Sequence, residues 1–140
     1  MKFQENETMP NYTKKPITKV QLVKYAGASG DFNPLHFDEE FAKKRGLKKL
    51  IAHGMLSMGF LSEYVESVFG VGKIKKIQVN FKSMVFVGEE ITCSGKINTL
   101  SNEENREFVL CSIEAKNKEE NIVTSGSVEV WIKQFKKGNL

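Results

Sequence analysis

The sequence predicts an α+β fold in which an antiparallel sheet packs around one long helix. Residues from about Gly54 to Phe69 carry apolar side chains around most of a helical circumference, which is typical of a buried helix. After Gly72 the apolar pattern changes from helical spacing to alternation and keeps it to Ile132. Successive strands joined by short loops form antiparallel sheets with one buried face, and the long helix is expected to cover that face.

The N-terminal part is expected to hold a polar arm and a first helix. Residues 1–16 are polar and are interpreted as an irregular arm or an edge strand. Thr18 followed by Gln21 forms a capping-box pattern, in which each side chain bonds a backbone amide at the start of a helix. This helix is expected to end at Gly27 or Gly30, because glycine readily adopts the left-handed conformation common at helix ends.

A second, short helix is predicted between Asp38 and Gly46. Its acids, residues 38–40, lie at the positive end of the helix dipole, and its bases, residues 43–45, lie at the negative end. This order of charges favours a helix and places His36 directly before it.

Four strands are predicted in the second half of the chain. Hairpin loops are expected at Gly88–Glu89, Ser101–Asn105 and Asn117–Asn121, where short hydrophilic stretches interrupt the alternation. We find no internal repeat and no linker, so residues 1–140 are expected to form a single domain. The side chains expected to face the core are Ile77, Val79, Phe81, Ile91, Cys93, Ile97, Val109, Cys111, Ile113, Ala115, Val128, Val130 and Ile132.

Composition argues against several classes of protein. The chain has 140 residues, 40% of them hydrophobic, and a net charge of +4. No apolar run approaches the ~20 residues of a membrane span, and the N-terminus lacks the apolar region of a secretory signal. The lysines are scattered without interleaved aromatic residues, which argues against nucleic-acid binding. Cys93 and Cys111 lack a redox or metal spacing and are expected to be buried, reduced thiols of a cytoplasmic protein.

The chemistry is expected on the loop Gly30–His36, which reads Gly-Asp-Phe-Asn-Pro-Leu-His. Pro34 keeps the preceding residue out of the helical region and Gly30 readily supplies a strained turn, so the loop is irregular. Asp31 and His36 are a candidate acid/base pair that can hold a water between them. Each also has a simpler explanation: Asp31 as a turn residue that bonds its own backbone, and His36 as a core histidine beside a helix.

Two further residues are assigned to substrate binding. Gly54 stands where the long helix begins, and free amides at the positive end of a dipole suit an oxyanion on a thioester or other carbonyl. The alternative is that Gly54 only permits close packing. Asn33 is expected either to brace the loop or to hydrogen-bond a catalytic partner. His53 is interpreted as a residue of the helix cap. With two histidines and no acidic cluster at ligand spacing, no metal site is expected.

These residues together resemble a known family. The resemblance lies in Gly30-Asp31-x-Asn33-Pro34-x-His36, followed by Asp38, Phe41-Ala42, Gly46 and Ile51-Ala52-His53-Gly54-Met55. This pattern is similar to that of the MaoC-like (R)-specific enoyl-CoA hydratases and the related 3-hydroxyacyl-thioester dehydratases. The similarity extends from about Pro16 to Phe135. It implies the hot dog fold, a long helix wrapped by an antiparallel sheet, within a single MaoC-like domain of residues 1–140.

The resemblance also implies a reaction, the reversible syn addition of water to a trans-2-enoyl thioester to give the (3R)-hydroxyacyl thioester. By position, Asp31 and His36 would be the catalytic acid/base residues, and the amide of Gly54 would bind the thioester carbonyl. The substrate would be an acyl-CoA or acyl-carrier-protein thioester, with no further cofactor, and the protein would form at least a homodimer.

Two other functions compete with this one. A hot-dog thioester hydrolase also polarises a thioester carbonyl, but such enzymes usually place a carboxylate on or beside the long helix. A non-catalytic subunit that binds acyl thioesters is the second alternative.

Overall fold

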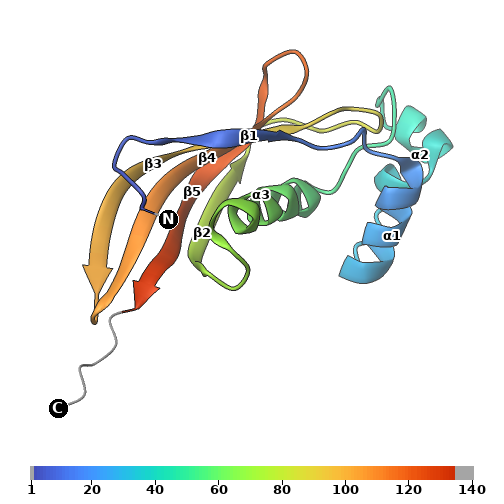
Figure 1. Cartoon of the computed structure of the whole chain (residues 1–140). Helices are drawn as coiled ribbons and strands as arrows, with labels where there is room; N and C mark the ends of the chain where they lie inside the picture. Colours follow the sequence, from blue (N-terminus) through green and yellow to red (C-terminus); the bar gives the residue numbers. More distant parts are fainter. Residues whose placement is uncertain (1, 135–140) are drawn as a thin grey trace.

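The computed structural model describes residues 2–134, and in this range a curved antiparallel sheet holds the long helix α3 against its concave face (Figure 1). The strands lie in the order β1-β3-β4-β5-β2. Their bounds are β1 Thr8–Thr13, β2 Ile74–Phe81, β3 Thr92–Glu103, β4 Arg106–Lys116 and β5 Ile122–Gln134. Residues 135–140, and with them Phe135 at the end of the family resemblance, lie outside the described range.

The helices begin and end close to where their capping residues predict. In α1 (Lys19–Ser29) the Thr18 hydroxyl accepts a hydrogen bond from the Gln21 amide at 3.1 Å, and the helix ends at Gly30 with φ of +76°. In α2 (Glu39–Lys44) the Asp38 carboxylate accepts from the Phe41 amide at 3.1 Å. The helix α3 spans Gly54–Phe69, as predicted. In residues 2–134, no helix is long and apolar enough to cross a membrane.

The core lies between α3 and the sheet. The helix contributes Leu56, Phe60, Leu61, Tyr64 and Val65, all buried, and the predicted inward positions of β4 are at most 2% exposed. The expectation that α3 is buried on most sides is wrong for this chain alone. One sheet covers one side of a helix, and Met55 on another side is 53% exposed.

The segment between β2 and β3 does not form the hairpin expected at Gly88–Glu89. β2 pairs with β5, and β3 pairs with β1 and β4, so residues 82–91 cross from one edge of the sheet towards the other. On the way the segment pairs with the connector before α3: the Ala52 amide donates to the Val85 carbonyl at 2.7 Å, and the Val87 amide donates to the Leu50 carbonyl at 2.9 Å. This pairing fixes the connector that leads into the functional site.

The other two connections within the sheet are short turns at or inside the predicted positions. β3 and β4 extend to a two-residue turn at Glu104 and Asn105, both with positive φ, inside the predicted loop 101–105. The turn between β4 and β5 lies at residues 117–121, as predicted. Within the polar segment 1–16, β1 pairs with β3 as an edge strand.

Candidate active site

The loop between α1 and α2 is held in shape by its own side chains. The Asp31 carboxylate accepts a hydrogen bond from the Asn33 amide at 3.2 Å, and the Asn33 side chain accepts from the Leu35 amide at 3.1 Å. Asn33 in this way caps the short 3-10 turn Pro34–His36. Each bond spans two residues, as in Asx turns, so the loop shape is encoded locally.

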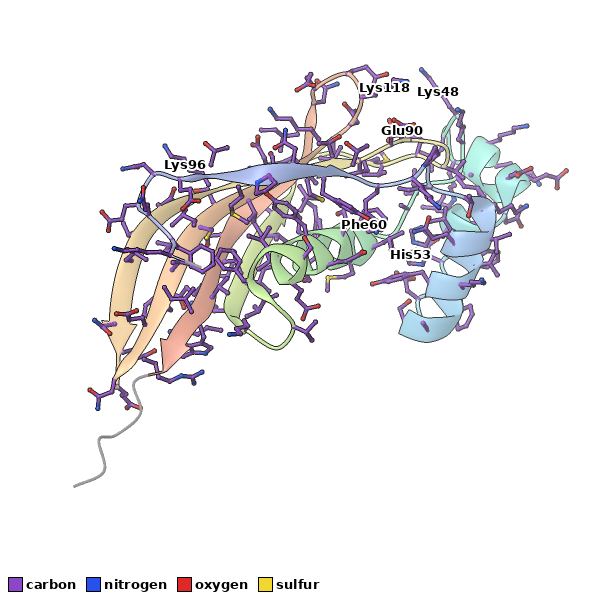
Figure 2. The ribbon with its side chains drawn as sticks, in the orientation of Figure 1. Lys48, His53, Phe60, Glu90, Lys96 and Lys118 are labelled. Carbon is purple, nitrogen blue, oxygen red and sulfur yellow. The ribbon has the colours of Figure 1, made fainter. Side chains whose placement is uncertain are left out.

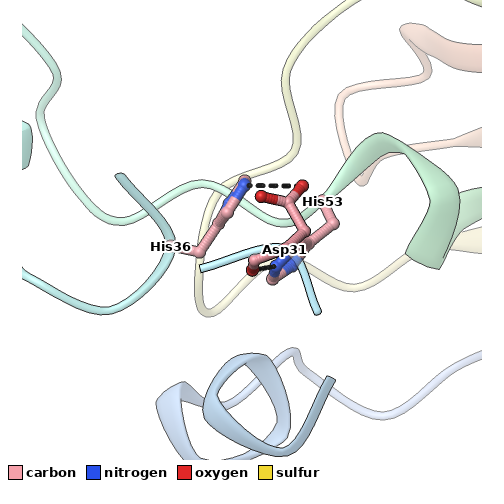
Figure 3. A group of neighbouring side chains, drawn as sticks. All are labelled: Asp31, His36 and His53. Atoms are coloured by element: carbon pink, nitrogen blue, oxygen red, sulfur yellow. Dashed lines mark hydrogen bonds and ion pairs between the residues drawn. The ribbon is translucent and has the colours of Figure 1, made fainter. Parts of the chain in front are cut away.

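The side chains of Asp31 and His36, the candidate acid/base pair, converge. Asp31 Oδ2 lies 3.8 Å from His36 Nε2, and the side chains are 56% and 8% exposed. On its other side His36 Nδ1 lies 2.7 Å from the Ile51 carbonyl, which can only accept, so Nδ1 carries a proton. In the neutral ring Nε2 is then the free base, and it faces Asp31. Figure 3 shows this pair.

His53 is a third member of the site. Its Nε2 lies 3.0 Å from the Asp31 main-chain carbonyl, and its ring stacks on that of His36 with centroids 3.6 Å apart and planes at 21° (Figure 3). It lies between α1 and the start of α3 (Figure 2) and is 3% exposed. The sequence predicts His53 as a residue of the helix cap but does not predict these contacts. No local pattern could, because Asp31 is 22 residues away.

Gly54 begins α3 immediately after His53. The N-cap residue His53 makes no side-chain capping bond, so its side chain does not occupy the amides of the first turn. A Cβ at Gly54 would lie 3.4 Å from the ring of Phe81. Both predicted roles of Gly54, amide donor and site of close packing, are compatible with this position.

A pocket of about 540 Å³ opens beside these residues. Its walls include His36, His53, Gly54, Ser57, Phe81 and Met84, and Lys82 and Ser83 also line it. Buried Ser57 bonds both the Gly54 carbonyl and the Thr124 hydroxyl at 2.7 Å, which ties the first turn of α3 to β5. Phe81 and Met84 are more than half exposed, so the pocket combines apolar walls with a few convergent polar groups, as ligand sites do.

A metal ion does not suit this cluster, although Asp31, His36 and His53 each offer a donor atom within 4.8 Å of the others. An ion bound by imidazole lies about 2 Å from the nitrogen, near the plane of the ring. The two rings are almost parallel and 3.6 Å apart, so one ion cannot lie near both planes.

Residues 2–119 match the family described as the MaoC like domain. The chain belongs to this family. A mitochondrial 3-hydroxyacyl-[acyl-carrier-protein] dehydratase of Arabidopsis thaliana is 33% identical over 103 residues, which are 73% of this chain and 62% of that protein. An (R)-specific enoyl-CoA hydratase of Rhodospirillum rubrum is 36% identical over 88 residues, 61% of each chain. The chain therefore aligns with about three-fifths of the length of these curated relatives.

Solved structures of MaoC-like proteins share the fold. The (R)-hydratase of Aeromonas caviae superimposes with a TM-score of 0.83 at 24% identity and covers 94% of this chain and 98% of its own. An R-hydratase of Pseudomonas aeruginosa has a TM-score of 0.83 at 25% identity, covering 99% of this chain and 90% of its own. The predicted hot dog fold is confirmed.

Proposed function

We propose that the protein is a lyase that reversibly hydrates trans-2-enoyl thioesters to (3R)-3-hydroxyacyl thioesters. The observation that carries the proposal is the Asp31–His36 pair, with 3.8 Å between carboxylate and imidazole, beside a pocket at the start of α3. Direct hydrogen bonds of this type are about 2.7–3.2 Å long, so the two groups are spaced to bind one water jointly. The relatives named as (R)-specific enoyl-CoA hydratases and as a dehydratase support the same chemistry.

In the proposed reaction Asp31 and His36 handle both proton transfers. The water oxygen forms a bond to carbon 3 of the enoyl group while one of the two side chains removes its proton. The electrons move towards the thioester carbonyl, and a proton is delivered to carbon 2. The amide of Gly54 would donate to the carbonyl oxygen as its negative charge develops, an interaction worth on the order of 10²–10³ in rate.

The test is the loss of the conjugated ultraviolet absorbance of a short enoyl-CoA, with wild type and Asp31→Asn compared side by side. Because general acid–base catalysis contributes about 10²–10⁴-fold, Asp31→Asn and His36→Ala should each lower kcat by that order. The product should be the (R)-hydroxyacyl thioester. An Asp31→Asn enzyme with near wild-type kcat would remove the role assigned to this carboxylate.

The same assay separates the alternative functions. A thioester hydrolase would release free CoA, which a thiol reagent detects. A non-catalytic subunit would bind acyl-CoA without hydrating or hydrolysing it. Asp31 lies on the loop after α1 and not within α3 itself, which favours the lyase over the hydrolase.

We further propose a homodimer, acting in the cytoplasm on CoA or carrier-protein thioesters without a separate cofactor. The dimer is supported by the exposed apolar residues beside the site, Phe32, Met55, Phe81 and Met84, each more than half exposed in the single chain. The cytoplasmic location is supported by two free, buried cysteines, Cys93 and Cys111. Sedimentation of the purified protein tests the dimer, and comparison of CoA with carrier-protein thioesters tests the substrate.

A further inference from the structure

We propose that His53 is a positioning residue that holds the acid/base pair in register with the start of α3; this inference rests on the proposed function. Its ring contacts both members of the pair, through the main-chain carbonyl of Asp31 and the ring of His36. Its own backbone is the N-cap of α3, directly before Gly54. One residue thus links the three groups to which the reaction is assigned, Asp31 and His36 through its ring and Gly54 through its backbone.

The contacts of His53 leave its ring little freedom. His36 lies on one side at 3.6 Å between centroids, and Tyr25 of α1 packs against the ring at 4.8 Å with planes at 59°. Because the Asp31 carbonyl can only accept, the bond of 3.0 Å places a proton on His53 Nε2. The other nitrogen, Nδ1, is buried and has no hydrogen-bond partner within residues 2–134. A residue that only filled space would not need a ring nitrogen at the Asp31 carbonyl.

The bond matters because the carboxylate of Asp31 is not itself buried. Its side chain is 56% exposed, so its position depends on how the loop backbone is held. The loop has local bonds of its own, but these fix its shape and not its distance from α3. The His36 end of the loop is tied to the connector before α3 through Ile51, whose amide donates to the Leu35 carbonyl at 3.2 Å. The His53 bond, which spans 22 residues, holds the Asp31 end. Misplacing a reacting group by about 1 Å can cost about 10²-fold in rate.

Two substitutions separate the hydrogen bond from the stacking. His53→Phe keeps a flat ring between His36 and Tyr25 but has no donor, whereas His53→Gln keeps an N–H donor near the same place without the ring. We expect His53→Phe to lower kcat by about 10- to 100-fold with KM changed less than about threefold. His53→Gln should recover part of the lost kcat. Val109→Ala, a cavity-forming change in β4 remote from the pocket, is the control: it should lower stability but leave kcat unchanged.

A double-mutant cycle with Asp31→Asn tests whether His53 acts through Asp31. If it does, His53→Phe should cost much less in the Asp31→Asn background than in wild type, because the group it positions is already inactive. Wild-type kcat in His53→Phe, or an undiminished effect in the Asp31→Asn background, would overturn the proposal.

A spectroscopic test needs no activity. The chain has two histidines, so nitrogen–proton correlation spectra contain the signals of two imidazole rings. The signals that are lost in His53→Phe belong to His53. When both imidazole rings are neutral we expect opposite tautomers, with the proton on Nδ1 of His36 and on Nε2 of His53. A neutral His53 ring with its proton on Nδ1 and none on Nε2 would refute the bond to Asp31. An inactive wild type with the expected tautomers would instead count against the proposed reaction while leaving the His53 contact in place.

Discussion

Gly126→Ala is expected to be among the most damaging single-methyl additions in the sheet. Gly126 lies in β5 between Val79 of β2 and Ile113 of β4. A Cβ at this position would overlap the carbonyl oxygen of Gln78 and lie 2.8 Å from the Cα of Val79. Both atoms belong to backbone, which cannot move aside as a flexible side chain can, so β2 must separate from β5.

The magnitude follows from two costs. Overpacking a well-filled site costs about 1–3 kcal/mol, and each ladder hydrogen bond that is lost removes about 1 kcal/mol. With two or so bonds broken around Val79, the free energy of unfolding should fall by about 3–5 kcal/mol, out of the 5–15 kcal/mol of a typical domain. At about 2 kcal/mol per molar urea, the unfolding midpoint should fall by about 2 M.

Urea unfolding followed by circular dichroism measures this, and Gly27→Ala in α1 is the matched control. The same methyl group at Gly27 would meet nothing within 4 Å, and the residue has no positive φ. Because alanine favours the helix over glycine, Gly27→Ala should raise stability by about 0.5–1 kcal/mol. A loss below about 1 kcal/mol in Gly126→Ala would show that β2 and β5 are not as close as described.

Other predictions concern the buried thiols, the Ser57–Thr124 pair and a helix cap. Burial raises the pKa of the thiols of both Cys93 and Cys111 from 9.0 to about 12, so neither should react with a thiol reagent at pH 8 until the protein is unfolded in urea. Between pH 9 and 12 the unfolded chain releases thiol protons that the native state retains. The free energy of unfolding should therefore fall with rising pH, by about 1.4 kcal/mol per unit for each thiol, and less steeply when a cysteine is replaced by alanine. Ser57→Ala leaves the buried Thr124 hydroxyl without its partner and should cost about 1–3 kcal/mol in urea unfolding, whereas adding Thr124→Val should recover part of that loss. Asp38→Ala removes the cap of α2 and should cost about 1 kcal/mol in the same assay, with no such loss for Asp38→Asn.

Features that depend on neighbouring residues could be predicted from the amino-acid sequence. Helix ends follow from caps such as Thr18 and Asp38, whose side chains bond amides three residues away. The shape of the Asp31–His36 loop follows from Asx turns that span two residues. The alternation of apolar residues in β4 identified its buried face because successive side chains point to opposite sides of a strand.

The pairing of segments and the contacts between residues far apart in the sequence could be seen only in the folded chain. The stretch around Gly88–Glu89 has the composition of a hairpin loop, but β2 and β3 do not pair, and Val85 and Val87 bond the connector before α3. In the same way nothing near His53 in the sequence indicates that its ring stacks on His36 and bonds Asp31. Such contacts depend on how the whole chain closes around the core, so local residue patterns carry no record of them.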